Sequence, residues 1–288
     1  MELLIYLILF LLVLIVSSTT NKLLPFLPLP LVQILLGIVI GLFLPNTDFH
    51  LNTELFLALV IGPLLFRESE EADITAILKH WRIIIYLIFP VIFISTLSLG
   101  GLAHLIWLSL PLAACLAVGA ALGSTDLVAF ASLSERFSFP KRVSNILKGE
   151  GLLNDASGLV AFQVALTAWT TGAFSLGQAG SSLIFSILGG FLIGFLTAMI
   201  NRFLHSFLLS VRATDIASEL LLELSLPLVT FFLAEEVHVS GIIAVVVAGI
   251  LKASRFKKIT LLEAQVDTVT ETVWHTVNFM LNGSVFVI

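Results

Sequence analysis

The chain has 288 residues, of which 58% are hydrophobic and only 11% are charged. An average soluble domain carries roughly 25% charged residues, so this composition excludes a soluble enzyme, a nucleic-acid-binding protein, a coiled coil and a disordered protein. The net charge of −5 says little about partners, because the positions of the charges matter more than their sum. The single cysteine, Cys115, allows no internal disulfide.

Ten apolar segments predict an all-α polytopic membrane protein, because a spanning helix needs about 20 mostly apolar residues. The segments are 2–20, 29–45, 53–66, 83–103, 109–133, 149–170, 183–201, 217–235, 239–251 and 269–288. The first lacks a basic region and a small-residue cleavage site, which favours a retained helix over a signal peptide. The third and ninth are short for a span, which indicates tilted or re-entrant elements. No linker divides the chain, so residues 1–288 are predicted to form a single transmembrane domain.

The basic residues fall on one side of this predicted topology. All 14 follow odd-numbered segments, and the loops after even-numbered segments hold none. The positive-inside rule therefore predicts a multi-pass protein of the cell membrane, with cytoplasmic basic loops and the N-terminus outside. In chain order the basic residues are Lys22; Arg67, Lys79 and Arg82; Arg136, Lys141, Arg142 and Lys148; Arg202 and Arg212; and Lys252, Arg255, Lys257 and Lys258.

The last segment ends at Ile288 without a basic stop, a polar tail or a cap. From this ending we expect a C-terminally incomplete chain, produced by a truncated reading frame or as a fragment.

Asp126 is the first candidate for an acid inside the membrane, where a charge costs at least about 2.5–3.5 kcal/mol. It follows Gly123, Ser124 and Thr125 in the middle of a predicted span. Glycine weakens a helix, and Ser, Thr and Asp compete for backbone hydrogen bonds, so this stretch predicts a helix broken at mid-membrane. The carbonyl groups at such a break can coordinate a cation, with Thr125 as an oxygen ligand and Asp126 supplying the charge. The alternative, small-residue packing between helices, explains the glycines but not the acid.

Asp155 is the second candidate. If 149–170 is helical, Gly151, Asp155 and Gly158 share one stripe, which lets another helix approach a carboxylate that exchanges a proton for a cation. The alternative is an acid that stabilises a helix N-terminus, and it fits Glu150 better than Asp155. Asn154 is a candidate for a hydrogen bond between helices, and Glu150 for an ion pair with a basic residue of another helix.

The remaining polar residues give weaker signals. Glu219 and Glu223 are one helical turn apart and either line a cavity or meet solvent at the membrane boundary. An acidic cluster after Phe66 is predicted to lie in a cytoplasmic loop. No nucleotide-binding, nucleophile or zinc-protease motif is found. The members of the acidic cluster are Glu68, Glu70, Glu71 and Asp73.

Two stretches resemble signature motifs of the monovalent cation:proton antiporter family, which contains the NhaP-type and NHE-type sodium/proton exchangers. Residues 124–129 read S-T-D-L-V-A, similar to the family's A-T-D-P-V-A on a broken helix. Residues 149–156 read G-E-G-L-L-N-D-A, similar to the family's G-E-S-L-L-N-D-A/G on the next helix. Residues 63–66 and 239–249 resemble the family's P-P-L-L-F and G-V-S-G-L-L-A-V-V-V-A-G runs.

The resemblance implies a fold of thirteen helices, with two inverted repeats of six and a linker helix, in which an ion-carrying core moves against a dimerisation side. It implies that Asp155 carries the cation or the proton in turn and that Glu150 pairs with an arginine of a later helix. Thr125 and Asp126 are implied to lie at the helix crossing, with Ser124 as a supporting residue.

The sequence departs from the family pattern at three places. Gly151 replaces a serine that offers a hydroxyl ligand, and Arg67 occupies the place of an acid, with Glu68 next to it. The family's second broken helix and the arginine partner of Glu150 would follow Ile288.

The favoured function is a secondary antiporter that exchanges Na⁺, K⁺ or Li⁺ for protons, so a metal ion at Asp155 is transported rather than structural. Asn154 in place of a second acid suggests one-for-one exchange. The expected partners are these ions and the lipid bilayer, with a homodimer in the complete form, no cofactor and no nucleic acid. The alternatives are a non-transporting fragment or accessory membrane protein, and an intramembrane aspartyl protease, whose Y-D and G-x-G-D motifs are absent.

Overall fold

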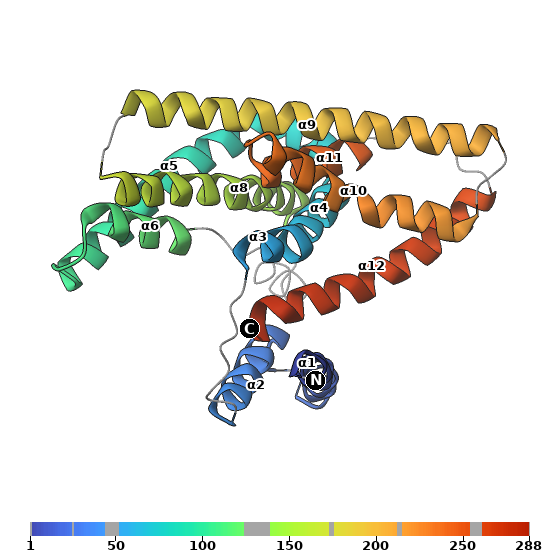
Figure 1. Cartoon of the computed structure of the whole chain (residues 1–288), viewed down its shortest axis with the longest axis horizontal. Helices are drawn as coiled ribbons and strands as arrows, with labels where there is room; N and C mark the ends of the chain where they lie inside the picture. The colour runs from blue at the N-terminus through green and yellow to red at the C-terminus, as the bar shows by residue number, and fades with distance from the viewer. Residues whose placement is uncertain are drawn as a thin grey trace.

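A computed structural model describes residues 2–287 apart from 25, 44–51, 124–138, 173–175, 212–214 and 254–260. Over these residues every regular element is helical, which confirms the predicted all-α class (Figure 1). The helices are α1 (Glu2–Leu23), α2 (Leu29–Phe43), α3 (Thr53–Phe56), α4 (Gly62–Glu71), α5 (Ile74–Ile106), α6 (Leu112–Leu122), α8 (Lys141–Thr171), α9 (Leu176–Ser210), α10 (Ile216–Glu236), α11 (Gly241–Ala253) and α12 (Leu261–Val287), with one π-helical turn, η1 (Leu57–Ile61), between α3 and α4.

Each predicted apolar segment contains helix in the described residues, but several helices run past the predicted ends. Three described helical stretches are long and apolar enough to cross a membrane, namely Lys79–Ile106, Ile184–Ser210 and Ile216–Glu236. Helices α1, α2, α6 and α11 contribute shorter apolar stretches. Hydropathy detects only the apolar part of a helix, whereas Lys, Arg and Glu are good helix formers and extend helices beyond it. The assignment of the basic residues to loops is therefore wrong throughout the described part of the chain, where they lie in helices. These residues are Lys22 of α1, Arg67 of α4, Lys79 and Arg82 of α5, Lys141, Arg142 and Lys148 of α8, Arg202 of α9 and Lys252 of α11.

Helices α5, α6 and α8 pack together and form one group, at the left of Figure 1. Ile84, Ile88 and Ile92 of α5 are its buried centre, with Ile146 and Ala161 of α8 packed against them. A Cβ on Gly100 of α5 would lie 2.9 Å from the Cα of Leu116, so this glycine lets the backbones of α5 and α6 approach closely.

A second group consists of α4, α9, α10, α11 and α12. Its centre is Phe66 of α4, Val245 of α11 and Trp274 of α12, each at most 1% exposed. Helix α11 lies between α4 and α9, and a Cβ on its Gly249 would lie 2.8 Å from the Cβ of Ser69. The predicted short ninth segment is therefore a helix buried by neighbouring protein.

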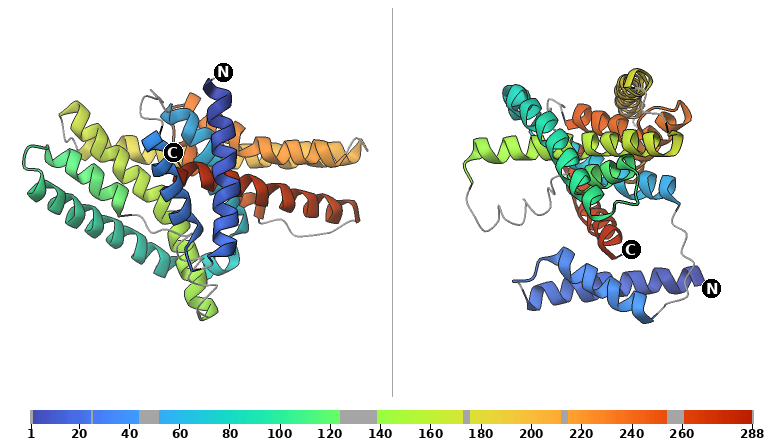
Figure 2. Two further views of the ribbon diagram at one scale, coloured as in Figure 1. Left: turned by 90° about the horizontal axis from the view of Figure 1, so that it is seen from below. Right: turned by 90° about the vertical axis from the view of Figure 1, so that its left-hand side faces the viewer.

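Helices α1 and α2 pack on each other and on α12. Figure 2 shows this pair lying across one side of the molecule, next to the C-terminal helix. The two groups described above meet chiefly through α8, which contacts both α4 and α9. Helix α8 therefore occupies the boundary between the groups.

Candidate functional site

Helix α8 carries three of the predicted site residues in consecutive turns. It begins after Pro140 and ends at Gly172, whose φ of 66° is the left-handed conformation that favours glycine at a helix end. The side chain of Glu150 is 6% exposed and that of Asn154 is fully buried. Asp155 lies on the same helix, and its side chain is outside the described residues.

The buried face of α8 also includes Gly151 and Gly158, the two glycines of the predicted stripe. Gly149, one residue before Glu150, faces α5, because a Cβ there would lie 2.9 Å from the Cδ1 of Ile84. The hydroxyl of Ser157 donates to the backbone carbonyl of Asn154 over 3.2 Å. This part of α8 therefore combines polar side chains with small residues at a helix interface.

Helix α6 ends where the sequence predicts a break. Its last residue is Leu122, and the backbone N–H of Gly123 bonds to the carbonyl of Ala120 over 3.3 Å. Ser124, Thr125 and Asp126 follow directly and lie outside the described residues. The predicted broken helix, and the place of Thr125 and Asp126 at a helix crossing, stay predictions.

A cluster of five charged side chains joins α4, α10 and α11, and sequence reasoning missed it. Arg67 contacts Glu70 at 2.9 Å and Glu71 at 2.7 Å, and Lys252 contacts Glu70 at 3.0 Å and also pairs with Glu223. Four of these side chains are 14–16% exposed, and Glu71 is 60% exposed. We call these five residues the charged cluster.

The charged cluster rests on aromatic rings of the protein core. The rings of Phe66 and Trp274 stack with their centres 6.1 Å apart. The guanidinium of Arg67 lies 6.0 Å from the centre of Trp274, and the amine of Lys252 lies 5.4 Å from that of Phe66. Cations over aromatic faces are stabilised by the ring electrons, so the cluster is anchored on both its polar and its apolar side.

The predicted acidic loop after Phe66 is wrong, because α4 continues through Glu71. The signal for this was present, since Arg67 with Glu70 and Glu71 has the i, i+3 and i, i+4 spacing that stabilises a helix. The pairing of Lys252 with Glu223 had no local signal, because 29 residues separate the two.

A second pair links α9 to α10 beside the charged cluster. The Nε2 of His205 lies 3.1 Å from Glu219, whose side chain is 9% exposed. Of the two alternatives for Glu219, solvation at the membrane boundary is excluded, because neighbouring protein buries this side chain. No group of three or more His, Cys, Asp and Glu side chains in the described part of the chain is arranged to hold a metal ion.

The sequence model of the family described as sodium/hydrogen exchanger, transmembrane, matches residues 7–288. A sodium, potassium, lithium and rubidium/H⁺ antiporter of Bacillus subtilis (strain 168) is 37% identical over 273 residues, which cover 95% of this chain and 41% of that protein. The uncharacterised Na⁺/H⁺ exchanger YjcE of Escherichia coli (strain K12) is 30% identical over 292 residues, covering all of this chain and 53% of that protein.

Among solved structures, the sodium proton antiporter MjNhaP1 from Methanocaldococcus jannaschii at pH 8 superposes with a TM-score of 0.73. The match covers 100% of this chain and 70% of that one at 20% sequence identity, which shows a shared fold. The chain spans less than half the length of the Bacillus relative and about half that of YjcE.

Proposed function

Because this chain belongs to the family of transmembrane sodium/hydrogen exchangers, we propose that it exchanges monovalent cations for protons across the cell membrane. The family is one of transporters, so a secondary antiporter is favoured over an enzyme. The Bacillus subtilis relative is named for sodium, potassium, lithium and rubidium, and we infer Na⁺, K⁺ and Li⁺ as the first ions to test here.

Asp155 is the residue that we propose to carry the cation and the proton in turn. A carboxylate binds Na⁺ when ionised and releases it when protonated, so the two ligands compete for one group. An acid in a membrane helix is costly, which favours retention for function. The neighbouring Asn154 is neutral, so one proton leaves for each cation bound and the exchange carries no net charge.

The buried polar face of α8 is the observation that carries this proposal. Glu150 and Asn154 are both buried there, on the helix that contacts both groups of the fold. Glu150 is the supporting acid, which we propose to be ion-paired and to orient the helix. Ser124, Thr125 and Asp126 follow directly after α6, which packs against α8, so they are the proposed second half of the cation site.

We propose that the basic residues lie on the cytoplasmic side of the membrane and that the N-terminus lies outside. Contacts between helix ends support the part of this topology that assigns those ends to a common side of the membrane. Lys252 near the end of α11 contacts Glu70 near the end of α4, and His205 in the last part of α9 contacts Glu219 in the first turn of α10. We further propose one exchanger domain over residues 1–288 and a homodimer, which cross-linking in intact membranes would detect.

Proton flux in everted membrane vesicles tests the exchange. Addition of Na⁺ should release protons from vesicles that contain the chain, and Asp155→Asn should abolish this flux while the amount of inserted protein is unchanged. Asp215→Asn is the matched control, because Asp215 is an exposed cap of α10 and Asn caps a helix equally well. Flux retained in Asp155→Asn would refute the role of Asp155, and absence of flux from the inserted unsubstituted chain would refute the activity.

A further inference from the structure

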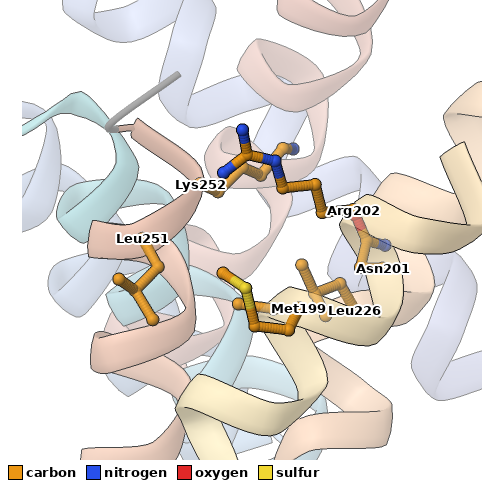
Figure 3. Close-up of a pocket in the computed structure, with 7 residues that line it drawn as sticks. Met199, Asn201, Arg202, Leu226, Leu251 and Lys252 are labelled. Carbon is orange, nitrogen blue, oxygen red and sulfur yellow. The ribbon is translucent and has the colours of Figure 1, made fainter. Parts of the chain in front are cut away.

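A pocket opens between α9, α10 and α11, beside the charged cluster. In Figure 3 the side chains of Arg202 and Lys252 lie at one side of this pocket and those of Met199, Leu226 and Leu251 at the other. The lining is therefore amphipathic, with two cations opposite an apolar surface. The lining residues are Ala198, Met199, Asn201 and Arg202 of α9, Leu226 of α10, and Leu251 and Lys252 of α11.

The two cations differ in how far protein neutralises them. Lys252 pairs with Glu70 and Glu223, so two carboxylates of the charged cluster already neutralise it. Arg202 is exposed, and no carboxylate of the described residues lies within ion-pair distance of it. Arg202 thus supplies an uncompensated positive charge and the fork of donors that matches a phosphate group.

The surface around the pocket is suited to lipid. Ile200, Phe203 and Phe207 on the outer side of α9 are each more than half exposed, and the rings of Phe203 and Phe207 stack 6.4 Å apart. They belong to the stretch Ile184–Ser210, which is long and apolar enough to cross a membrane. Arg202 lies towards one end of this stretch, and Lys252 lies in the last turn of α11. A charged group near the end of a membrane helix meets the level of lipid headgroups.

The sequence next to the pocket adds positive charge. Arg255, Lys257 and Lys258 follow Lys252 within six residues. Clusters of basic residues beside a membrane helix attract anionic lipids.

We propose that this pocket binds the phosphate of an anionic phospholipid, with Arg202 as the main ligand and Lys252 at the edge of the site. The glycerol and the first acyl carbons lie against Met199 and Leu251, which are both partly exposed. This apolar half is the reason to assign a lipid rather than free phosphate, because inorganic phosphate has no apolar part that could contact these side chains. The bound lipid would contact α9, α10 and α11 together.

Native mass spectrometry and thermal unfolding of the purified chain in detergent test this site. Phosphatidylglycerol should remain bound and raise the unfolding temperature more than phosphatidylcholine does, and inorganic phosphate should have no such effect. Arg202→Gln should weaken phosphatidylglycerol binding about tenfold, the change expected for loss of one strong charge-assisted contact. Arg202→Lys keeps the charge but not the fork, and should give an intermediate affinity.

The matched control is Arg82→Gln, since Arg82 is also an exposed arginine, on α5 and 5.6 Å from the ring centre of Trp81. It should bind phosphatidylglycerol as the unsubstituted chain does. Unchanged binding in Arg202→Gln, equal weakening by Arg82→Gln, or equal stabilisation by inorganic phosphate would each overturn the proposal. Thermal unfolding in phosphatidylcholine alone reports whether the Arg202→Gln variant folds. If this variant does not fold, Arg202→Lys decides the matter. Phosphatidylglycerol binding by Arg202→Lys that equals that of the unsubstituted chain, at equal stability, overturns the proposed fork geometry.

Discussion

Replacement of Lys252 by methionine should destabilise the protein far more than loss of one surface charge. Lys252 joins Glu70 of α4 to Glu223 of α10, and all three side chains are 14–16% exposed. The charged cluster has two cations and three carboxylates, and Lys252→Met leaves Arg67 as its single cation. Arg67 still contacts Glu70, but Glu223 loses the only described side chain that pairs with it.

The size of the effect follows from leaving a buried charge without its partner. Breaking a buried ion pair costs about 3–5 kcal/mol, and we expect about 3 kcal/mol because some solvent reaches these side chains. Glu223→Gln should cost only about 1 kcal/mol, since Lys252 keeps Glu70 and the glutamine still accepts a hydrogen bond. The double variant Lys252→Met with Glu223→Gln should then be more stable than Lys252→Met alone, with a coupling energy of about 1–3 kcal/mol.

Thermal unfolding in detergent without anionic lipid, with all four proteins measured together, gives these values. Lys22→Met on α1 is the control, because Lys22 is exposed and forms no ion pair among the described residues. Its effect should stay within about 0.5 kcal/mol. Strictly additive costs, or a Lys252→Met variant as stable as Lys22→Met, would show that the charged cluster contributes no buried pairing energy.

Three further predictions concern other parts of the molecule. Asp126→Ala should abolish exchange in the vesicle assay. Thr125→Ala should weaken the apparent cation affinity with less effect on the maximal rate, because alanine keeps the backbone carbonyl. Unchanged affinity at every pH would contradict this role of the Thr125 side chain. Gly100→Ala should lower the free energy of unfolding by about 1–3 kcal/mol, because its Cβ would meet the backbone of Leu116. A Cβ on the neighbouring Gly101 would have no atom within 4 Å, so Gly101→Ala should stabilise α5 by about 0.5–1 kcal/mol. Equal effects of the two variants in thermal unfolding would refute the close packing of α5 on α6. Hydrogen bonds from the hydroxyl and the backbone N–H of Ser218 lower the pKa of Asp215. The ionised cap therefore stabilises α10 at neutral pH, and this stability is lost as the pH falls through the lowered pKa. The difference in unfolding temperature between Asp215→Ala and the unsubstituted chain should shrink in acid, and a constant difference would exclude the ionised cap.

Hydropathy predicted where helices lie because the membrane demands apolar stretches, and it could not predict where they end. Helix α4 illustrates this, since its second half holds Arg67, Glu70 and Glu71, which no apolar pattern detects. Glu150 and Asn154 are buried, as are Gly151 and Gly158 of the small-residue stripe on α8. The helical repeat of about 3.6 residues, which predicted the stripe, places these four residues on one side of the helix. The contact of Lys252 with Glu223 depends on how α10 and α11 pack, which local spacing does not encode.

The packing of α1 and α2 on α12 has a consequence for synthesis of the protein. Gln33 of α2 is 1% exposed, and Gly283 of α12 packs against Leu14 of α1, so the last described helix completes the burial of the first two (Figure 2). About 220 residues separate Phe43 from Leu261, and a ribosome adds roughly 5–20 residues per second. The first hairpin therefore waits roughly 10–45 s in the bilayer, with its glutamine amide uncovered, before its partner helix is translated. During that interval the insertion machinery or a neighbouring lipid headgroup has to shield Gln33, which makes this residue a sensitive point for membrane quality control.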